Sequence, residues 1–199
     1  MRILIIGANG TLGKRISGEL SKKNEIIKAG RNSGEVRVDI ESGESIEKMF
    51  KQVKNIDACV ITAGSAHFGS LQSMTEENVY TGIKSKLMGQ VNTVLIGQNY
   101  INEKGSFTLT SGILAEDPVK FSSAFALVNG GLNSFVIGAA RELTKGIRIN
   151  IVSPGLVEDS VEQLGAFFPG HIPVEMKKVV SAYIKSVEGC GTGEIIKVY

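Results

Sequence analysis

RILIIGANGTLG, residues 2–13, sets the architecture of this chain. It opens with a short and almost uninterrupted apolar run rich in isoleucine, typical of a parallel strand buried on both faces. Three glycines follow, Gly7, Gly10 and Gly13, and apolar residues then recur with helical spacing over 12–20. The stretch therefore predicts a strand, a tight glycine turn and a helix in direct succession.

Composition excludes several classes of protein. The chain has 199 residues, a net charge of +2 and only two cysteines, which lie far apart. A near-neutral charge gives no strong field for nucleic acid or an anionic membrane, and the cysteines form no metal or redox motif. No uninterrupted apolar run reaches the roughly 20 residues of a membrane span. We therefore expect one cytoplasmic domain, residues 1–199, with no metal site.

Strand-like and helical patterns alternate along the rest of the chain. A capping-box spacing at 73–76 predicts the start of a long helix that ends at Gly105, and a second long helix is predicted over 122–145, before Gly146. A shorter helix is predicted over 173–186. The fold class is therefore α/β, a single-domain doubly wound parallel β-sheet of about seven strands with helices on both faces. The predicted strands are 2–8, 25–30, 36–40, 57–62, 106–110, 147–152 and 194–199.

The glycine turn has the chemistry of an anion site. Glycines let the backbone approach a pyrophosphate closely, and the free amides at a helix start carry partial positive charge. The spacing here is GxxGxxG, which differs from the GxGxxG fingerprint. A glycine-rich turn without a ligand is the alternative, but its place between strand and helix favours dinucleotide binding.

The end of the second predicted strand bears on the choice of dinucleotide. An acidic residue at this place accepts the ribose hydroxyls of NAD, whereas an arginine pairs with the 2′-phosphate of NADP. This strand ends at Gly30 and is followed by Arg31, with Ser33 nearby. We therefore expect NADP(H) to be preferred, with NAD(H) kept possible by Glu35 and Asp39.

An ordered series of motifs resembles the short-chain dehydrogenase/reductase family over essentially the whole chain. After the glycine loop come Asp39-Ile40, Thr62-Ala63-Gly64, Thr110-Ser111, the segment 128–132, the run GIRINIVSPG at 146–155, and Thr192-Gly193-Glu194. The resemblance implies a Rossmann fold and hydride transfer between a nicotinamide cofactor and a small or medium carbonyl or alcohol. It also implies a homodimer or homotetramer formed through the two long helices.

The same resemblance reveals a departure at the reacting centre. Family members use a Ser that holds the substrate oxygen, a Tyr that transfers the proton, and a Lys four residues after the Tyr. The Ser matches Ser111, but the Tyr position is Phe125 and the Lys position is Asn129. A phenyl ring has no proton to give, although Asn129 retains the ability to hydrogen-bond the ribose.

Lys86 is our candidate for the missing proton donor. It falls where the family has an Asn that helps connect the catalytic Lys to a water chain, so that Asn and Lys would have exchanged places. We expect its ammonium to act through Ser111 or water, since a desolvated lysine titrates low enough for this work. A surface lysine on a long helix is the alternative. His67, in the loop after residues 57–62, is a weaker acid–base candidate.

The sequence therefore predicts an NADP(H)-dependent oxidoreductase with an atypical active site, or alternatively a non-catalytic NADP(H) sensor on the same fold. Phe167 and Phe168 lie where the family has its substrate lid, and they indicate either an apolar substrate wall or lid packing. The predicted catalytic residues are Ser111, Lys86 and Asn129. The predicted cofactor-binding residues are Gly7, Asn9, Gly10, Thr11, Leu12, Gly13, Arg31, Asp39, Ile40, Ala63, Gly64, Asn129, Pro154 and Gly155.

Overall fold

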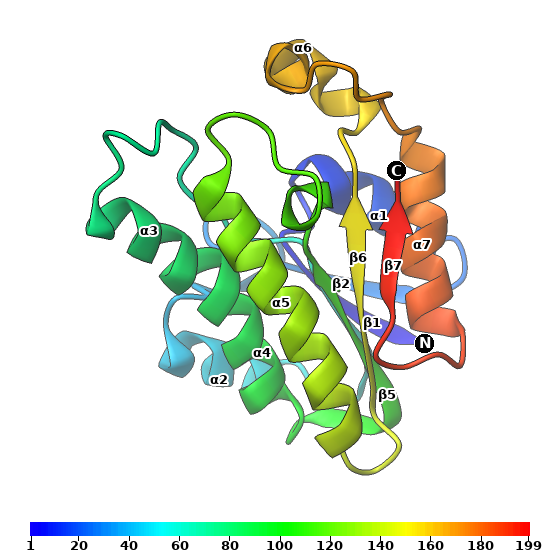
Figure 1. Ribbon diagram of the computed structural model, residues 1–199. Coiled ribbons are helices and arrows are strands. Elements are labelled where there is room, and N and C mark those ends of the chain that lie inside the picture. The colour runs from blue at the N-terminus through cyan, green and yellow to red at the C-terminus, as the bar shows by residue number, and fades with distance from the viewer.

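The computed structural model describes residues 1–199 and contains one seven-stranded sheet, with all strand pairs parallel (Figure 1). The strand order is β3-β2-β1-β4-β5-β6-β7. The predicted doubly wound fold is therefore confirmed. The strands are β1 (Arg2–Ile6), β2 (Glu25–Gly30), β3 (Val36–Arg37), β4 (Ile56–Ile61), β5 (Ile101–Thr110), β6 (Arg148–Pro154) and β7 (Ile195–Val198).

Helices and short helical turns connect the strands. The α-helices are α1 (Thr11–Leu20), α2 (Gly43–Gln52), α3 (Glu76–Gly82), α4 (Gly89–Gly97), α5 (Ser123–Glu142), α6 (Val161–Leu164) and α7 (Met176–Glu188). A π-helical turn, η1 (Ile83–Met88), joins α3 to α4. Three 3-10 turns are η2 (Ile113–Ala115), η3 (Glu158–Ser160) and η4 (Gly165–Phe167).

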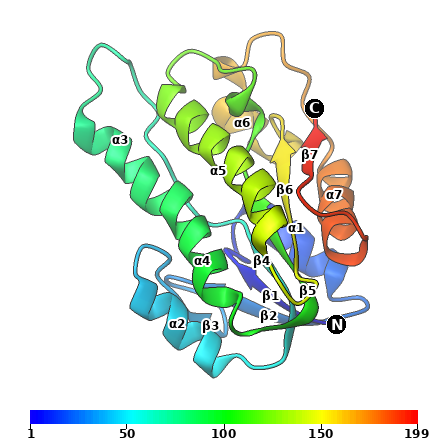
Figure 2. The ribbon, with the colours of Figure 1, turned by 60° about the horizontal axis from the view of Figure 1, so that its bottom comes forward.

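Alternation along β1 divides the core into two layers. Leu4 and Ile6 belong to the cluster formed with α2, α4 and α5, whereas Ile3 and Ile5 belong to the cluster formed with α1 and α7. Successive strand residues point to opposite faces of a sheet, so an apolar run is buried on both sides. Figure 2 shows these two helix layers, with α2, α4 and α5 on one side and α1 and α7 on the other.

Helix α5 is long and apolar enough that length and composition alone would permit a membrane span. In this fold it packs against β6, and its buried side chains Val128, Leu132 and Val136 face the sheet and the turn η1. The apolar residues on this side of α5 are therefore part of the protein core.

The long helix predicted to run from 73 to Gly105 is wrong at both ends. It begins at Glu76, because Thr75 is the N-cap and exchanges reciprocal bonds with Asn78. It ends at Gly97, and the side chains of Gln98 and Asn99 donate to carbonyls of its last turn at 3.0 and 3.4 Å. Such side-chain bonds compete with helix continuation, and β5 then starts at Ile101.

Smaller differences occur elsewhere. The third strand has only two residues, and the last helix runs over Met176–Glu188 instead of 173–186. The strand order reverses direction between β1 and β4, whose carboxyl ends therefore flank an open crevice. In a doubly wound sheet this is the place where ligands bind.

Candidate functional site

The glycine loop after β1 is shaped by backbone contacts. Gly7 has a φ of +87°, a conformation that side chains disfavour, and its amide donates to the carbonyl of Ala29 at 2.9 Å. A Cβ on Gly13 would lie 2.1 Å from the carbonyl oxygen of Gly7. Glycine at both positions therefore lets α1 start directly against the end of β1.

The start of α1 offers donors without competition from a side chain. Gly10 is the N-cap residue, and no side-chain hydrogen bond caps the helix. The first amides of a helix have no partner within it. Those of Thr11, Leu12 and Gly13 thus lie at the positive end of a ten-residue helix. The loop fits a diphosphate group.

A pocket of about 440 Å³ opens beside this loop, at the crevice between β1 and β4. Several of the predicted cofactor residues line this pocket, namely Gly7, Asn9, Gly10, Arg31, Ile40, Ala63 and Gly64. The pocket is also lined by Ser33, which the sequence analysis named only beside Arg31, and by Ser65 and Ser85, which it missed. Asn9 Nδ2 donates to Ser33 Oγ at 2.8 Å and so ties the glycine loop to the turn after β2.

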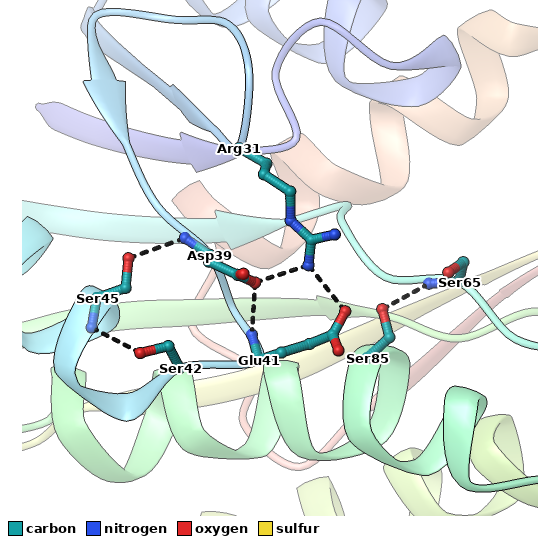
Figure 3. A network of polar contacts seen from close by, with 7 residues as sticks. All are labelled: Arg31, Asp39, Glu41, Ser42, Ser45, Ser65 and Ser85. Carbon is teal, nitrogen blue, oxygen red and sulfur yellow. Dashed lines mark hydrogen bonds and ion pairs between the residues drawn. The ribbon is translucent and has the colours of Figure 1, made fainter. Parts of the chain in front are cut away.

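Arg31 does not stand alone at the end of β2. Its Nη2 donates to Asp39 Oδ1 at 2.7 Å and to Glu41 Oε1 at 2.8 Å, as Figure 3 shows. The two carboxylates raise the pKa of Arg31, and the hydrogen bond from Arg31 is the main cause that lowers the pKa of Asp39. From the sequence we expected Arg31 to meet a phosphate at this position, but we did not expect its pairing with Glu41.

The end of β4 touches the π-helical turn. Gly64 has a φ of +117°, and a Cβ there would lie 2.7 Å from the Cα of Lys86. The amide of Ser65 donates to Ser85 Oγ at 3.3 Å, a contact that Figure 3 includes. This close approach holds the π-turn against the strand end. Such turns occur frequently at functional sites.

Lys86 consequently points inward. It is 9% exposed, and its Nζ makes a long 3.5 Å contact with the backbone oxygen of Ser111 and lies 5.8 Å from the centre of the Phe125 ring. Burial alone lowers the pKa of Lys86 to about 8. The alternative of a surface lysine is excluded by this burial.

Ser111 follows β5, and the residue before it, Thr110, is held by side chains from both faces of the sheet. The amide of Gln90 brackets Thr110, accepting from its N–H and donating to its carbonyl, both at 2.9 Å. Thr110 Oγ1 also lies 2.6 Å from the hydroxyl of the fully buried Tyr183. Sequence inspection missed Gln90 and Tyr183, because their spacing gives no sign that they meet Thr110.

Two buried polar atoms near the end of β5 have no hydrogen-bond partner within the protein. Four buried side-chain polar atoms lack a hydrogen bond, and two of them are Ser111 Oγ and Asn129 Oδ1. Asn129 lies on α5, is 2% exposed and packs beside Gly112. Buried polar atoms usually have partners, so each exception needs an explanation such as a ligand.

The nicotinamide end of the predicted site lies at the end of β6. Pro154 is the last residue of that strand, and the amide of Gly155 donates to Val198 at 2.9 Å. The two acidic residues that follow have structural roles. Glu158 accepts from the amide of Met176 at 2.9 Å, and Asp159 pairs with Arg15 of α1 at 3.0 Å.

Comparison with known proteins agrees with this geometry. A family model described as enoyl-(acyl carrier protein) reductase matches residues 12–171. The chain belongs to the short-chain dehydrogenase/reductase family of oxidoreductases. Within this family, it is 28% identical to the uncharacterized oxidoreductase YmfI of Bacillus subtilis, over 79% of this chain and 75% of that protein.

Solved structures support the family assignment. The protein lin1944 from Listeria innocua is 49% identical over the full length of both chains, with a TM-score of 0.98. A small-chain dehydrogenase in complex with NADPH is 25% identical, with a TM-score of 0.87 over 100% of this chain and 96% of that one. Against the family pattern, Phe125 and Asn129 stand where a Tyr and a Lys are usual.

We predict that Lys86→Met raises the free energy of unfolding at pH 7. The pKa of Lys86 in the fold is about 8, below its ordinary value of 10.5. The unfolded chain therefore binds the proton more tightly, and the native ammonium costs up to about 3 kcal/mol below pH 8. This cost is lost as the pH rises from about 8 to 10.5.

Urea titrations of both proteins at several pH values test this prediction. The advantage of Lys86→Met should be constant below pH 8 and should shrink above it. Lys84→Met, on the exposed side of the same turn, is the control and should show no such trend. An advantage that does not vary between pH 7 and 10 would contradict burial as the cause.

Proposed function

We propose that this protein is an NADP(H)-dependent oxidoreductase that transfers hydride between the nicotinamide ring and a small carbonyl or alcohol. The observation that carries the proposal is the glycine loop, whose uncapped helix start faces the pocket at the β1–β4 crevice. The NADPH complex of the 25% identical dehydrogenase supports it. So does a 3-oxoacyl-[acyl-carrier-protein] reductase of Buchnera aphidicola, 23% identical over 98% of this chain and 94% of that protein.

Each part of the cofactor has residues that suit it. The amides of Thr11, Leu12 and Gly13 would bind the diphosphate, and Ile40 and Ala63 would contact the adenosine. Asn129 would hydrogen-bond the nicotinamide ribose, and Pro154 and Gly155 would line the ring. When bound, the cofactor supplies or accepts the hydride.

The protein's own residues handle the proton. Ser111 Oγ has no internal hydrogen-bond partner, so it is free to hold the substrate oxygen. The Lys86 ammonium, next to the Ser111 backbone, donates a proton to that oxygen directly or through one water. In the reverse direction the neutral amine accepts the proton. A pKa near the working pH suits both roles.

The preference for NADP(H) depends on Arg31. Its guanidinium would pair with the 2′-phosphate, but Asp39 and Glu41 already occupy it. These exposed pairs are weak, each worth roughly 0–1 kcal/mol, so a doubly charged phosphate can displace them. Glu41 then acts against NADP(H), because its carboxylate remains near the phosphate.

We predict opposite effects from two substitutions at this subsite. Arg31→Ala should weaken NADPH binding roughly tenfold to a hundredfold by removing a charge-assisted bond, with little effect on NADH. Glu41→Gln should strengthen NADPH binding severalfold, because it removes a repelling charge. Calorimetric titration of both nucleotides measures these changes.

Glu44→Gln, in the first turn of α2, is the matched control for Glu41→Gln and should leave both dissociation constants unchanged. If the wild-type protein gives neither heat nor a thermal shift with either nucleotide, the proposed function is wrong. Equal losses for NADH and NADPH in Arg31→Ala would refute the 2′-phosphate role.

We further predict that Lys86→Met lowers kcat for carbonyl reduction by about 10²–10⁴-fold, the usual contribution of a positioned acid. In the wild type, the reduction rate should fall as the pH rises through about 8, because the ammonium loses its proton. This pH dependence should disappear in Lys86→Met. NADPH oxidation, followed by absorbance, measures both effects, with Lys84→Met as the control.

A sensor without turnover is the second candidate, and Phe125 in place of the usual Tyr favours it. The two functions differ in one observable. Tight NADPH binding with no oxidation across a panel of aldehydes and ketones would support the sensor. Reduction that survives unchanged in Lys86→Met would support neither Lys86 nor the sensor.

We also propose that two copies of the chain associate through α4 and α5, in the cytoplasm. Leu95 on α4 and Leu127 and Ile137 on α5 are about half exposed, at 49%, 51% and 49%. Burying such side chains stabilises an interface. Leu127→Glu should therefore shift the protein to a monomer in light scattering, whereas Leu71→Glu, at an exposed site outside these helices, should not.

A further inference from the structure

Four phenylalanine rings from three separate segments meet at the carboxyl end of the sheet. Phe68 contacts Phe167, Phe121 and Phe125, with ring centres 5.0, 6.3 and 6.4 Å apart. Phe121 and Phe167 lie 6.5 Å apart. We call these four residues the phenylalanine cluster. All the contacts are edge-to-face, with interplanar angles between 63° and 77°.

The segments that carry the cluster all lie at one end of the molecule. Figure 1 shows the loop before α3, the loop before α5 and the region of α6 at the end to which the strands point. The amide of Gly69 donates to the carbonyl of Phe121 at 3.0 Å and joins the first two of these loops. The cluster is therefore assembled at the carboxyl end of the sheet from segments that are far apart in the sequence.

One ring is held in a strained backbone. Phe121 has a φ of +73°, which is rare for a bulky side chain. The hydrogen bond from Gly69 helps to maintain this conformation, and it directs the ring toward Phe68 and Phe167. Strained residues cluster at ligand-binding and active sites, where surrounding structure holds them.

The cluster adjoins the polar groups of the reacting centre. Phe125 belongs to it, and the Lys86 ammonium lies 5.8 Å from the centre of that ring. Phe125 also packs against a small buried apolar group that includes Leu114 and Phe168. An apolar wall therefore borders Lys86 and Ser111, the two residues proposed to act on the substrate oxygen.

We propose that the substrate is an aryl carbonyl compound, whose ring binds edge-to-face within the phenylalanine cluster while its oxygen reaches Ser111. This inference rests on the proposed function and names its substrate class. Phe167, which is 38% exposed, is the cluster member that can move aside for the ring. The aromatic edges and faces already present favour another ring over a saturated group.

For an aryl aldehyde, the proposed reaction is reduction to the alcohol. The carbonyl carbon would gain a C–H bond with the hydride that a bound NADPH supplies, while the C4–H bond of the dihydronicotinamide and the C=O π bond break. The oxygen takes the proton of the Lys86 ammonium to form the alcohol. The aldehyde is reduced, NADPH is oxidised, and solvent returns the proton to the amine.

Binding of two unreactive amides tests the substrate class. Benzamide and cyclohexanecarboxamide have the same skeleton and the same carbonyl group, and they differ in the π system. Calorimetry should give a dissociation constant for benzamide about threefold to tenfold lower, as expected for one or two aromatic contacts. The dissociation constants are measured with and without NADPH. Binding of the ring to the phenylalanine cluster is then measured even if the nucleotide does not bind.

Two variants separate ring recognition from folding. Phe121→Asn introduces a residue that tolerates positive φ, so the melting temperature should not fall. The preference for benzamide should nevertheless shrink, because the variant lacks one ring of the cluster. Phe68→Leu removes the central ring and should abolish the preference. Tyr100→Leu removes a ring stacked on Phe50 outside the site and should leave the preference intact.

Three results would overturn the inference: equal affinity for the two amides, an unchanged preference in Phe68→Leu, or loss of the preference in Tyr100→Leu. NADPH binding decides the other proposal separately. A protein that binds NADPH but shows no benzamide preference retains the proposed function and loses the aryl substrate.

Discussion

An ammonium buried without a carboxylate partner is the constraint around which this site is arranged. A buried charge is costly unless it is paired, and Lys86 has only a long contact to a backbone oxygen and the face of one ring. The surrounding structure must therefore maintain it. Gly64 lets the strand end approach the π-turn, and that turn directs Lys86 inward. A buried, unpaired ammonium lowers the stability of the fold. Its presence here is therefore our reason for proposing that Lys86 is the proton donor.

The two ends of the crevice are built in different ways. At the end beside β2, where we propose that the adenosine binds, the positive potential comes from backbone amides and from one arginine that pairs with two carboxylates. At the reacting end it comes from one desolvated side chain, beside hydroxyl and amide groups without internal partners. Backbone groups bind without titrating, whereas Lys86 can gain and lose a proton near neutral pH. This division matches a protein that holds a cofactor at one end and changes a substrate at the other.

Replacement of the usual Tyr by Phe125 connects the two proposals about the reacting end. The ring has no hydroxyl, yet it keeps an aromatic surface that belongs to the phenylalanine cluster and lies against the ammonium. In the proposed mechanism, Lys86 supplies the proton that the usual Tyr would give, so the chemistry is kept by a different route. The apolar surface that Phe125 adds is also the basis of our proposal that the substrate is an aryl carbonyl compound.

Local pattern was enough for the alternation of strands and helices and for the glycine loop. An apolar run, a helical period and a glycine at a strand end are all properties of neighbouring residues. Contacts between distant residues were decided by the tertiary structure alone. The π-turn adds a residue to a helical turn and rotates the next turn by about 100°, so helical spacing could not fix where Lys86 points. Arg31 meets Glu41 only because the chain returns along β3, and Phe68 meets Phe167 only because the parallel strands end together. Spacing along the chain records which residues are available, and packing of the sheet decides which of them face one another.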